Sequence, residues 1–488
     1  MQRMQTDDVS SLVKVYAAPS GAVLQNNYKV RVRAVGENEW RDLPTYRVKV
    51  DMHDVRYAEM AYFDFSGKAE VEVSGPFYIC EAVVRPLAAG IDIENDTKRV
   101  RFTLDRPVNI SIELNKDRYH NVHLFAGMID EHAPDNDEKE AFKYTKLEGD
   151  LSKPGFIGPD VFESPEFLNK RKLWITPGIY YVDECVMDIP GDSEIYVEGG
   201  GIIIGGFRCQ NAENVKIWGR PVFYQAGFER FNGINGIRLS FSKNIVLENI
   251  IFVNPCHYTV YMGGCENVYI NNVKSFSCEG WSDGIDMMSS RHIRIEGGFL
   301  RTSDDCIAIY GSRWKYYGDC YDIVVQNIVL WADVAHPTMI GTHGDHKGNG
   351  DRISGICFRN LNILEHNEPQ AGYLGCMAIN AGDKNIIEDV TYENINIEPF
   401  LHGKVIDLQV RWNKDYNPAP GGGIKNITFR NIYYHGDNEV TSVINGYDES
   451  RKVENITIVN FVRNGLRCRD FGGANIKVGR HTKNVVID

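Results

Sequence analysis

The stretch that decides the fold is Asn244–Asn249, which reads NIVLEN, because the same six-residue phrase recurs along the second half of the chain. Each copy alternates apolar with variable residues and ends in Asn, as expected of one short strand and the turn that closes it. Further copies read NVYINN from Asn267, DIVVQN from Asp322, GICFRN from Gly355, DVTYEN from Asp389, NITFRN from Asn426 and NITIVN from Asn455, with weaker copies from Asn214, His292 and Asn484.

The spacing of the phrases, about 23 to about 37 residues, predicts the architecture. A spacing near 25 is typical of one coil of a parallel β-helix, in which three short strands and three turns complete each coil. Coils stack about 4.7–4.9 Å apart, so the recurring Asn side chains should form a ladder of amide hydrogen bonds. A β-propeller or a second sandwich is the alternative, and the variable spacing disfavours both. We therefore expect an all-β protein with a right-handed parallel β-helix over residues 171–488.

The residues before the repeats have a different pattern. Short runs such as YRVKVDM (Tyr46–Met52) and VNISIELN (Val108–Asn115) alternate apolar with polar residues. Alternation of this kind, bounded by turn residues, predicts half-buried antiparallel strands and a β-sandwich. An acidic stretch, Ile129–Tyr144, then predicts a linker. Residues 1–170 are thus expected to form an N-terminal antiparallel β-sandwich with its linker.

Composition narrows the possible partners. The chain has 488 residues, 43% of them hydrophobic, a formal net charge of −13 and a pI near 5.5. An acidic, well-folded surface repels phosphate groups, so we expect neither nucleic acid nor a membrane as partner. No apolar stretch reaches the length of a membrane span. A polyanionic substrate is disfavoured more weakly, because a local basic cleft can override the net charge, and the oligomeric state stays open.

The cysteines and the first residues bear on location. Eleven cysteines are scattered from Cys80 to Cys468 without a pairing pattern, which predicts free and mostly buried thiols in a reducing compartment. The first residues, Met1–Tyr16, lack the basic-then-apolar layout of a signal peptide. The sequence as it stands predicts a cytoplasmic protein, or an exported one if a leader has been removed.

Two phrases in neighbouring repeats concentrate acidic residues: WSDGID at Trp281–Asp286 and TSDDCIAI at Thr302–Ile309. Asp283 lies about one short coil before Asp304 and Asp305, so the three carboxylates should stack. Stacked like charges cannot all ionise at neutral pH, so at least one pKa should rise. A protonated carboxylic acid beside an ionised one is what cleavage of a glycosidic bond requires. The alternative for each Asp alone is a solvated turn residue.

A histidine-rich stretch, Ala335–His346, follows one coil later. His336 lies about one coil plus a loop beyond Asp305, so we expect it beside the carboxylates. His343 and His346 lie in a Gly-rich loop, and their spacing matches no familiar set of metal ligands. We expect no metal and no other cofactor, with a Ca²⁺ site formed by the acidic cluster as the alternative.

These phrases resemble the polygalacturonase family and its relatives. The resemblance rests on the repeat, on SDGID at Ser282–Asp286, on RTSDDCIAI at Arg301–Ile309, and on His336 followed by IGTHG at Ile340–Gly344. The sandwich ahead of the helix is similar to the dextranase and isopullulanase family. Together these resemblances cover nearly the whole chain, and they imply an inverting glycoside hydrolase.

The resemblance also implies a role for each catalytic candidate. Asp304 would be the general acid, and Asp283 with Asp305 would hold and deprotonate the attacking water. His336 would support the acid by hydrogen bonding. A single displacement of this kind predicts an acid–base separation of roughly 6.5–9.5 Å.

The chain also departs from the family pattern. Trp281–Ser282 stand where the family has Asn-Thr, and Ala335 and Pro337 replace the glycines that flank the histidine. Where the family has Arg-Ile-Lys, the chain reads Ala378–Asn380, so two cations that grip a uronate are missing. We therefore expect an α-linked, neutral poly- or oligosaccharide as substrate. The alternatives are pectic uronates with Arg411 as substitute cation, a Ca²⁺-dependent lyase, and a non-catalytic glycan-binding β-helix.

Loop residues with aromatic or planar polar side chains are the candidate sugar contacts, because rings stack on pyranose faces and planar groups bind hydroxyls. Tyr317 and Asn413 lie in the same loops, and ordinary loop packing is the alternative for every one of these residues. The predicted substrate-binding residues are Trp281, Asp286, Trp314, Tyr316, His343, Asp345, Tyr373, Asn380, Arg411 and Trp412.

Overall fold

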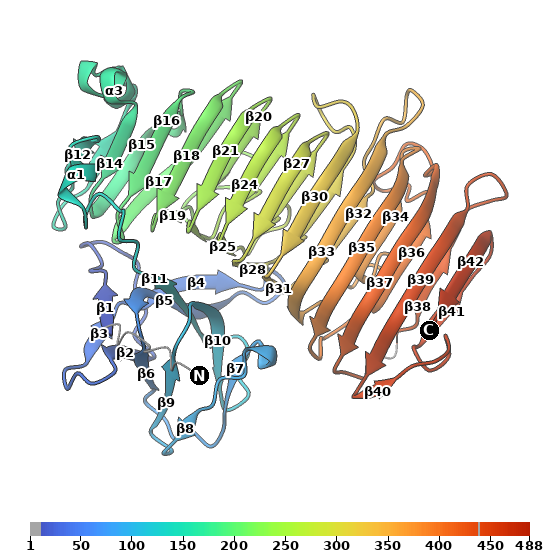
Figure 1. Cartoon of the computed structure of the whole chain (residues 1–488), viewed down its shortest axis with the longest axis horizontal. Coiled ribbons are helices and arrows are strands. Elements are labelled where there is room, and N and C mark those ends of the chain that lie inside the picture. Colours follow the sequence, from blue (N-terminus) through green and yellow to red (C-terminus); the bar gives the residue numbers. More distant parts are fainter. Residues whose placement is uncertain (1–10, 438–439) are drawn as a thin grey trace, which may run out of the picture.

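The computed structural model describes residues 11–437 and 440–488. The chain forms a long parallel β-helix with a β-sandwich along its N-terminal half, drawn below it in Figure 1. The predicted all-β fold class, a right-handed parallel β-helix behind a sandwich, is confirmed. The first ten residues, which belong to the predicted sandwich and to the segment compared with a signal peptide, lie outside the described residues.

The sandwich has two sheets. The pairing is antiparallel except between the neighbours β5 and β11, which run parallel. One sheet has the order β1-β5-β11-β10-β7 with β4 paired to β5, and the other has the order β3-β2-β6-β9-β8. The strands are β1 (Leu12–Val15), β2 (Lys29–Ala34), β3 (Arg41–Leu43), β4 (Tyr46–Val50), β5 (Arg56–Ser66), β6 (Ala69–Ser74), β7 (Ala82–Arg85), β8 (Glu94–Asn95), β9 (Arg99–Leu104), β10 (Val108–Leu114) and β11 (Val122–Met128), with a 3-10 turn at Leu87–Ala89.

Strand β5 packs the sandwich against the β-helix. Its sequence RYAEMAYFDFS is buried at eight consecutive positions, so it lacks the alternation of a strand with one solvated face. One face packs into the sandwich core through residues such as Phe63. The other face packs against the β-helix, where Met60 and Tyr62 share a core cluster with Phe299 and Trp331. The two domains therefore share a buried apolar interface.

Each coil of the helix contributes strands to parallel columns. The first column carries the recurring phrase and comprises β12 (Thr145–Leu147), β14 (Lys172–Ile175), β16 (Ser193–Val197), β18 (Glu213–Gly219), β21 (Lys243–Glu248), β24 (Glu266–Asn271), β27 (Arg291–Glu296), β30 (Cys320–Gln326), β33 (Arg352–Glu365), β35 (Ile386–Ile397), β37 (Gly423–Tyr434), β39 (Val453–Arg463) and β42 (Thr482–Ile487). From β33 to β39 these strands continue into the second column.

The second column faces the sandwich and comprises β19 (Val222–Tyr224), β22 (Ile251–Val253), β25 (Lys274–Phe276), β28 (Phe299–Thr302) and β31 (Val329–Ala332). The third column comprises β20 (Ile237–Ser240), β23 (Val260–Gly263), β26 (Ile285–Met288), β29 (Ile307–Tyr310), β32 (Thr338–Gly341), β34 (Gly375–Ala381), β36 (Lys404–Val410), β38 (Ser442–Asn445) and β41 (Ile476–Val478). The remaining strands are β13 (Gly155–Ile157), β15 (Gly178–Asp188) and β17 (Gly201–Gln210) at the start, and β40 (Leu466–Arg467) near the end.

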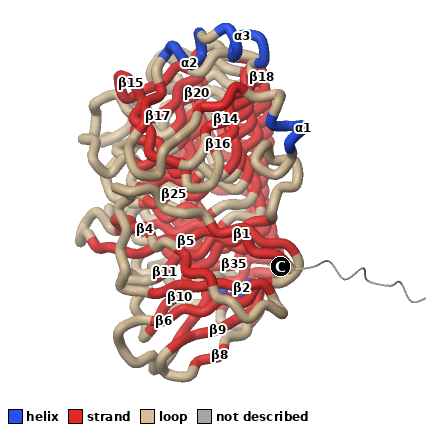
Figure 2. The backbone as a smooth tube through the Cα atoms, turned by 90° about the vertical axis from the view of Figure 1, so that its left-hand side faces the viewer, coloured by secondary structure: helices blue, strands red, loops and turns tan. Residues whose placement is uncertain are grey.

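The long sheet begins at β12, so the first coil starts before residue 171, where the domain boundary was expected. The reason is that part of the expected linker is ordered. Its helix α1 (Glu138–Ala141) is followed by β12, and α2 (Pro159–Glu163) and α3 (Pro165–Lys170) lie at the open end of the first coil (Figures 1 and 2). Phe162 and Phe167 enter the core there and cover it from solvent.

The predicted Asn ladder is confirmed, and a second one runs beside it. At the end of the phrase, Asn394 donates to Asn360 at 3.0 Å and Asn431 donates to Asn394 at 2.8 Å. At its start, Asn484 donates to Asn455 at 3.0 Å. These residues have φ near +55°, a conformation that Asn tolerates better than most residues. Asn therefore suits the ladder positions for two reasons: its backbone tolerates the left-handed conformation, and its side-chain amide forms the hydrogen bonds between coils.

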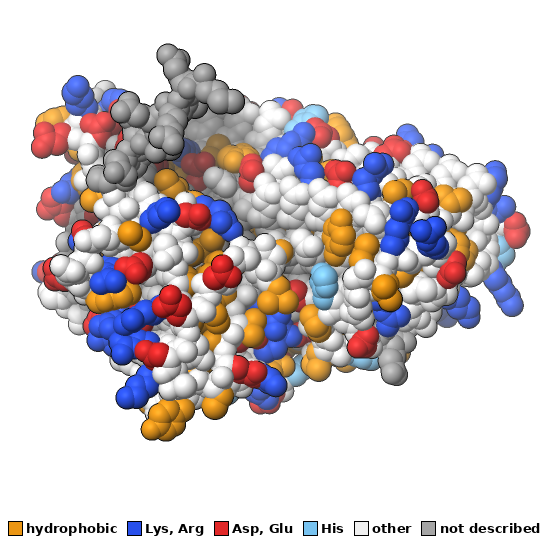
Figure 3. Space-filling view, turned by 60° about the horizontal axis from the view of Figure 1, so that its bottom comes forward, with side chains coloured by type: hydrophobic (Ala, Val, Ile, Leu, Met, Phe, Trp, Pro, Cys, Tyr) orange, Lys and Arg blue, Asp and Glu red, His pale blue; other side chains and the backbone are white. Residues whose placement is uncertain are grey.

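Two further expectations can be compared with the structure. All eleven cysteines are free and most are buried. Among the described residues no helix is long and apolar enough to cross a membrane. Basic and acidic side chains are interspersed over the face seen in Figure 3, so the net charge forms no continuous acidic surface there.

Candidate active site

The catalytic candidates lie in the turns between the second and third columns of three consecutive coils. Asp283 precedes β26, Asp304 and Asp305 precede β29, and His336 precedes β32. The backbone ladder aligns them, since Gly284 donates to the carbonyl of Asp305 at 2.8 Å and Cys306 donates to that of His336 at 2.8 Å. The expected stacking on neighbouring coils is therefore present.

The three carboxylates lie closer together than expected. One oxygen from each of Asp283, Asp304 and Asp305 lies within 4.8 Å of the other two. The separation of roughly 6.5–9.5 Å, predicted from the general rule for inverting pairs, is therefore wrong for this site. The short turns before β26 and β29 bring the carboxylates together at the spacing of adjacent coils. The same three oxygens are near enough for one cation to contact all of them.

Asp304 is the most accessible of the three, while Asp283 and Asp305 are buried. Its Oδ2 accepts the backbone N–H of Trp281 at 2.6 Å, and its Oδ1 accepts that of Asp305 at 3.0 Å. Burial, together with the charge of Asp305, raises the pKa of Asp304 to about 6. This carboxyl can therefore hold a proton in mildly acidic solution and still face the solvent.

Neighbouring carboxyls are perturbed in the same direction. Burial, followed by repulsion from Asp286, Asp304 and Asp305, raises the pKa of Asp283 well above its ordinary value. Burial also raises the pKa of Asp286, which Arg313 opposes. Charge repulsion at these distances means that the carboxyl groups share protons as a set, as predicted.

His336 stands between a carboxylate and a carbonyl. Its Nδ1 lies 2.6 Å from Oδ1 of Asp305 and its Nε2 lies 2.9 Å from the carbonyl of Tyr373. Because a carboxylate and a carbonyl only accept, both ring nitrogens donate and the ring is an imidazolium. Burial lowers the pKa of His336, but the charge and hydrogen bond of Asp305 outweigh it and raise the pKa to about 9. The expected hydrogen bond to the acid, Asp304, goes to Asp305 instead.

Arg313, which the sequence analysis did not select, lies beside the carboxylates. It comes from the loop after β29, and its Nη1 lies 3.9 Å from Oδ2 of Asp286. Its guanidinium packs over Trp314 and Tyr310, with centroid distances of 4.6 and 4.9 Å. Among the described residues, neither this Nη1 nor the oxygens of Asp286 have a hydrogen-bond partner. Buried polar atoms without partners inside a cleft are available to a ligand.

A signal for Arg313 was present in the sequence, because SRWKYY begins shortly after the TSDDCIAI phrase that contains Asp304 and Asp305. The loop also helps to form a cavity of about 200 Å³ with three other segments of the chain. The lining combines cationic, acidic, aromatic and polar groups, namely Ser312, Arg313, Trp314, Tyr317, His343, Gly344, Asp345, His346, Lys347, Asp383, Tyr416 and Pro418. Of the predicted substrate-binding residues it thus brings together Trp314, His343 and Asp345.

Other predicted substrate-binding residues are partly exposed or lie next to the catalytic candidates. Trp281 and Trp314 are about half exposed, at 46% and 47%, so part of each ring is accessible. Tyr373 lies against His336 in an edge contact, with a centroid distance of 4.7 Å. Arg411 lies over the Tyr373 ring at 5.8 Å, and its buried Nη1 has no hydrogen-bond partner among the described residues. Trp412 is 43% exposed.

Two of the predicted substrate-binding residues, Tyr316 and Asn380, are buried and pack against other parts of the protein. Tyr316 is buried, and its hydroxyl shares a 2.7 Å hydrogen bond with Ser240, so it packs inside the loop rather than facing a ligand. Asn380 is buried in β34 and donates to the carbonyl of Asp407 at 3.2 Å. The sequence pattern did not reveal the position of Tyr316 because a loop's aromatic residues can turn inward or outward, and Asn380 is buried because every position of β34 is.

The fold and the carboxylate cluster define a class of protein, the parallel β-helix with a glycosidase-like acid site. The chain is similar to the polygalacturonase-like superfamily of β-helix glycoside hydrolases. Residues 232–471 match the model of the family described as glycosyl hydrolases family 28, and they include all four catalytic candidates. The predicted resemblance is therefore confirmed.

Curated relatives support the assignment. A polygalacturonase of Juniperus ashei is 26% identical over 254 residues, covering 50% of this chain and 45% of that protein. A polygalacturonase of Chamaecyparis obtusa is 31% identical over 220 residues, covering 44% and 39%. A probable rhamnogalacturonase C of Aspergillus niger is 25% identical over 290 residues, covering 54% and 55%. The chain thus spans about half or less of the length of these relatives.

Among solved structures, Dex49A from Penicillium minioluteum superposes with a TM-score of 0.64 and 12% sequence identity. The match covers 97% of this chain and 96% of that one, so it includes the sandwich as well as the β-helix. At this identity the likeness concerns the fold, and it supports the arrangement of both domains.

Proposed function

We propose that the chain is an inverting glycoside hydrolase that cleaves α-linked, uronate-containing pectic chains. The observation that carries the catalytic part is Asp304, a cleft-facing carboxyl whose pKa rises to about 6 beside the ion pair of Asp305 and His336. Such a group can donate a proton to a leaving oxygen while its neighbours hold water.

In the proposed reaction the proton of Asp304 passes to the glycosidic oxygen as the bond from that oxygen to the anomeric carbon breaks. Water attacks the anomeric carbon, and its proton passes to one of the two carboxylates, Asp283 or Asp305. The imidazolium of His336 stabilises the negative charge of Asp305 throughout. Since three carboxylates converge, one pair can bind the water while the third acts as acid, which supports single displacement despite the short separation.

Two kinds of support favour pectic substrates over the neutral α-glycan that the sequence analysis placed first. The relatives bear the names polygalacturonase and rhamnogalacturonase. A neutral glycan was expected because Ala378 and Asn380 carry no positive charge to bind a uronate. Lys347 and His346 line the adjoining cavity beside Asp345 and Asp383. Nη1 of Arg411 has no hydrogen-bond partner among the described residues, and Nη1 of Arg313 forms a 3.9 Å ion pair with Asp286 but no hydrogen bond. A buried carboxylate needs a paired cation or several donors, and these groups can supply them.

The test is release of reducing ends from polygalacturonate, from rhamnogalacturonan and from neutral α-glucans, with equal amounts of protein. We expect turnover on a pectic chain and none by the Asp304→Asn variant. Preference for a neutral α-glucan would overturn the substrate part of the proposal. Absence of turnover on the whole panel would overturn the catalytic part.

A further inference from the structure

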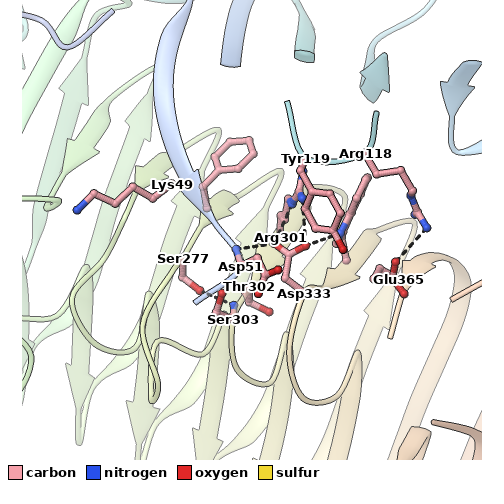
Figure 4. A network of polar contacts seen from close by, with 12 residues as sticks. Lys49, Asp51, Arg118, Tyr119, Ser277, Arg301, Thr302, Ser303, Asp333 and Glu365 are labelled. Carbon is pink, nitrogen blue, oxygen red and sulfur yellow. Dashed lines mark hydrogen bonds and ion pairs between the residues drawn. The ribbon is translucent and has the colours of Figure 1, made fainter. Parts of the chain in front are cut away.

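The turn between β4 and β5, Asp51–Val55, reaches from the sandwich to the coils that carry the carboxylates (Figure 4). Asp51 has a left-handed backbone, with φ of 58°, and its side chain accepts the N–H of His53 at 3.1 Å. The turn is therefore shaped by its own residues, and its first N–H groups point toward the β-helix.

These N–H groups contact the segments next to the catalytic candidates. Met52 donates its backbone N–H to Oγ of Ser303 at 3.0 Å, and Ser303 immediately precedes Asp304. Asp51 donates to Oδ2 of Asp333 at 3.3 Å, in the turn that leads to His336. The sandwich thus touches the backbone on the approach to both groups.

The Met52 side chain lies near Gly280 and Trp281, a second segment that contacts Asp304. A Cβ placed on Gly280 would lie 3.8 Å from Sδ of Met52 and 2.7 Å from Nη1 of Arg230, so the thioether lies beside this glycine together with the guanidinium. The next residue is Trp281, whose N–H donates to Asp304. One residue of the sandwich therefore backs both the segment before Asp304 and its hydrogen-bond donor.

A buried polar network holds the turn in register (Figure 4). Arg301, 0% exposed, donates to both oxygens of Asp333 at 2.9 and 3.0 Å and to Asn121 of the sandwich at 3.1 Å. At the start of the turn, Lys49 and Asn254 exchange two hydrogen bonds, at 2.9 and 2.8 Å. A network whose members are all paired is rigid, since breaking one bond leaves a buried polar atom unsatisfied.

We propose that the sandwich is a working part of the active site, and that Met52 and Ser303 are positioning residues that hold Asp304 at the height where it meets the glycosidic oxygen. Neither residue touches the substrate. Misplacement of a catalytic group by a fraction of an ångström lowers the rate of the chemical step more than it lowers binding. The inference rests on the proposed hydrolase activity for its readout.

The test compares Ser303→Ala, which removes the acceptor, and Met52→Ala, which removes the packing, with the conservative Met52→Leu. Asn109→Ala is the matched control, because Asn109 donates to Asn272 at 2.8 Å across the same domain interface but away from the cluster. kcat and KM are measured on the best pectic substrate, together with the melting temperature and the stoichiometry of oligosaccharide binding.

We expect kcat to fall about tenfold or more in Ser303→Ala and several-fold in Met52→Ala, with KM within about twofold. Met52→Leu should recover most of the loss, and Asn109→Ala should keep the wild-type kcat. Retention of more than half of kcat by both alanine variants would overturn the positioning role. An equal loss in Asn109→Ala, or a fall in binding stoichiometry that matches the fall in kcat, would also overturn it. A wild-type protein without turnover contradicts the proposed function instead.

Discussion

Nδ1 of His336 lies 2.6 Å from Oδ1 of Asp305, and the two residues belong to neighbouring coils. The imidazolium and the carboxylate form a buried ion pair, in which removal of either partner leaves an unpaired charge. The pKa of His336, raised to about 9, keeps this pair charged throughout the neutral range. The pH response of the site below that value must therefore come from other groups.

We expect activity to fall as the pH rises through about 6. Asp304 must be protonated to act as acid, and its pKa is raised to about 6. The same shift means that the folded protein binds this proton more tightly than the unfolded chain, so the contribution of Asp304 to stability is present at low pH and is lost as the pH rises through 6. A profile of kcat/KM against pH measures the descending limb. A limb near pH 9 instead would assign the acid to a different group.

Substitution of the acid is the most direct change to the site. Asp304→Asn keeps the size of the side chain but removes the proton donor, so kcat should fall by roughly two to four orders of magnitude. Substrate binding, measured by calorimetry, should stay close to that of the wild type. The exposed Asp488→Asn change is the matched control. A variant that keeps more than about a tenth of the wild-type kcat would remove Asp304 from the acid role.

Arg313 should determine preference for charged sugars. In Arg313→Gln we expect the ratio of kcat/KM on oligogalacturonides to that on their carboxyl-reduced analogues to fall by about tenfold, because one charge-assisted contact is lost. Arg359→Gln, in the first column, serves as control. The ratio cancels any general effect on the acid cluster. An unchanged ratio would leave Arg411, whose guanidinium lies over the Tyr373 ring, as the candidate cation.

Chelation separates the hydrolase from a metal-dependent lyase. Since carboxyls and His336 can fill every role in the proposed reaction, turnover should survive excess EDTA. The experiment can distinguish the two enzymes because the three oxygens lie within 4.8 Å of one another, near enough for a divalent cation to bind among them. Loss of turnover that Ca²⁺ restores would favour the metal-dependent alternative.

The first-formed product should have the inverted anomeric configuration. The short carboxylate separation makes this prediction stringent, since roughly 5–5.5 Å is usual for enzymes that retain configuration. Proton NMR during the first minutes of reaction distinguishes the two anomers. A retained product would mean that one of Asp283 and Asp305 attacks the sugar directly.

Much of this architecture could be predicted from the sequence because the fold repeats. A coil converts a fixed distance along the chain into stacking in space, so the phrase at Asn244 and the interval from Asp283 to Asp304 were informative. The ladder residues could be read in the same way, as their amides bond to the equivalent residue one coil away.

The remainder depends on elements that do not repeat. Loop lengths differ from coil to coil, so nothing in the pattern placed Arg313 beside Asp286 or turned Tyr316 inward. The contact of Met52 with Ser303 joins residues 251 positions apart in different domains. The predicted distance between the carboxylates was too long because a rule for paired acids was applied to three acids on adjacent coils.

The Asn ladders have a consequence for how the protein meets its ligand. Hydrogen-bonded side chains join many neighbouring coils at the ends of the first-column strands, and parallel backbone pairing joins all of them, so we expect the rise per coil to stay the same when a sugar binds. Many enzymes close hinged domains around their substrates, whereas the coils that bear the carboxylates are joined by continuous parallel strand pairing. We therefore expect the spacing of the charged groups to be set during folding rather than during binding, so that the polysaccharide adapts its conformation to it.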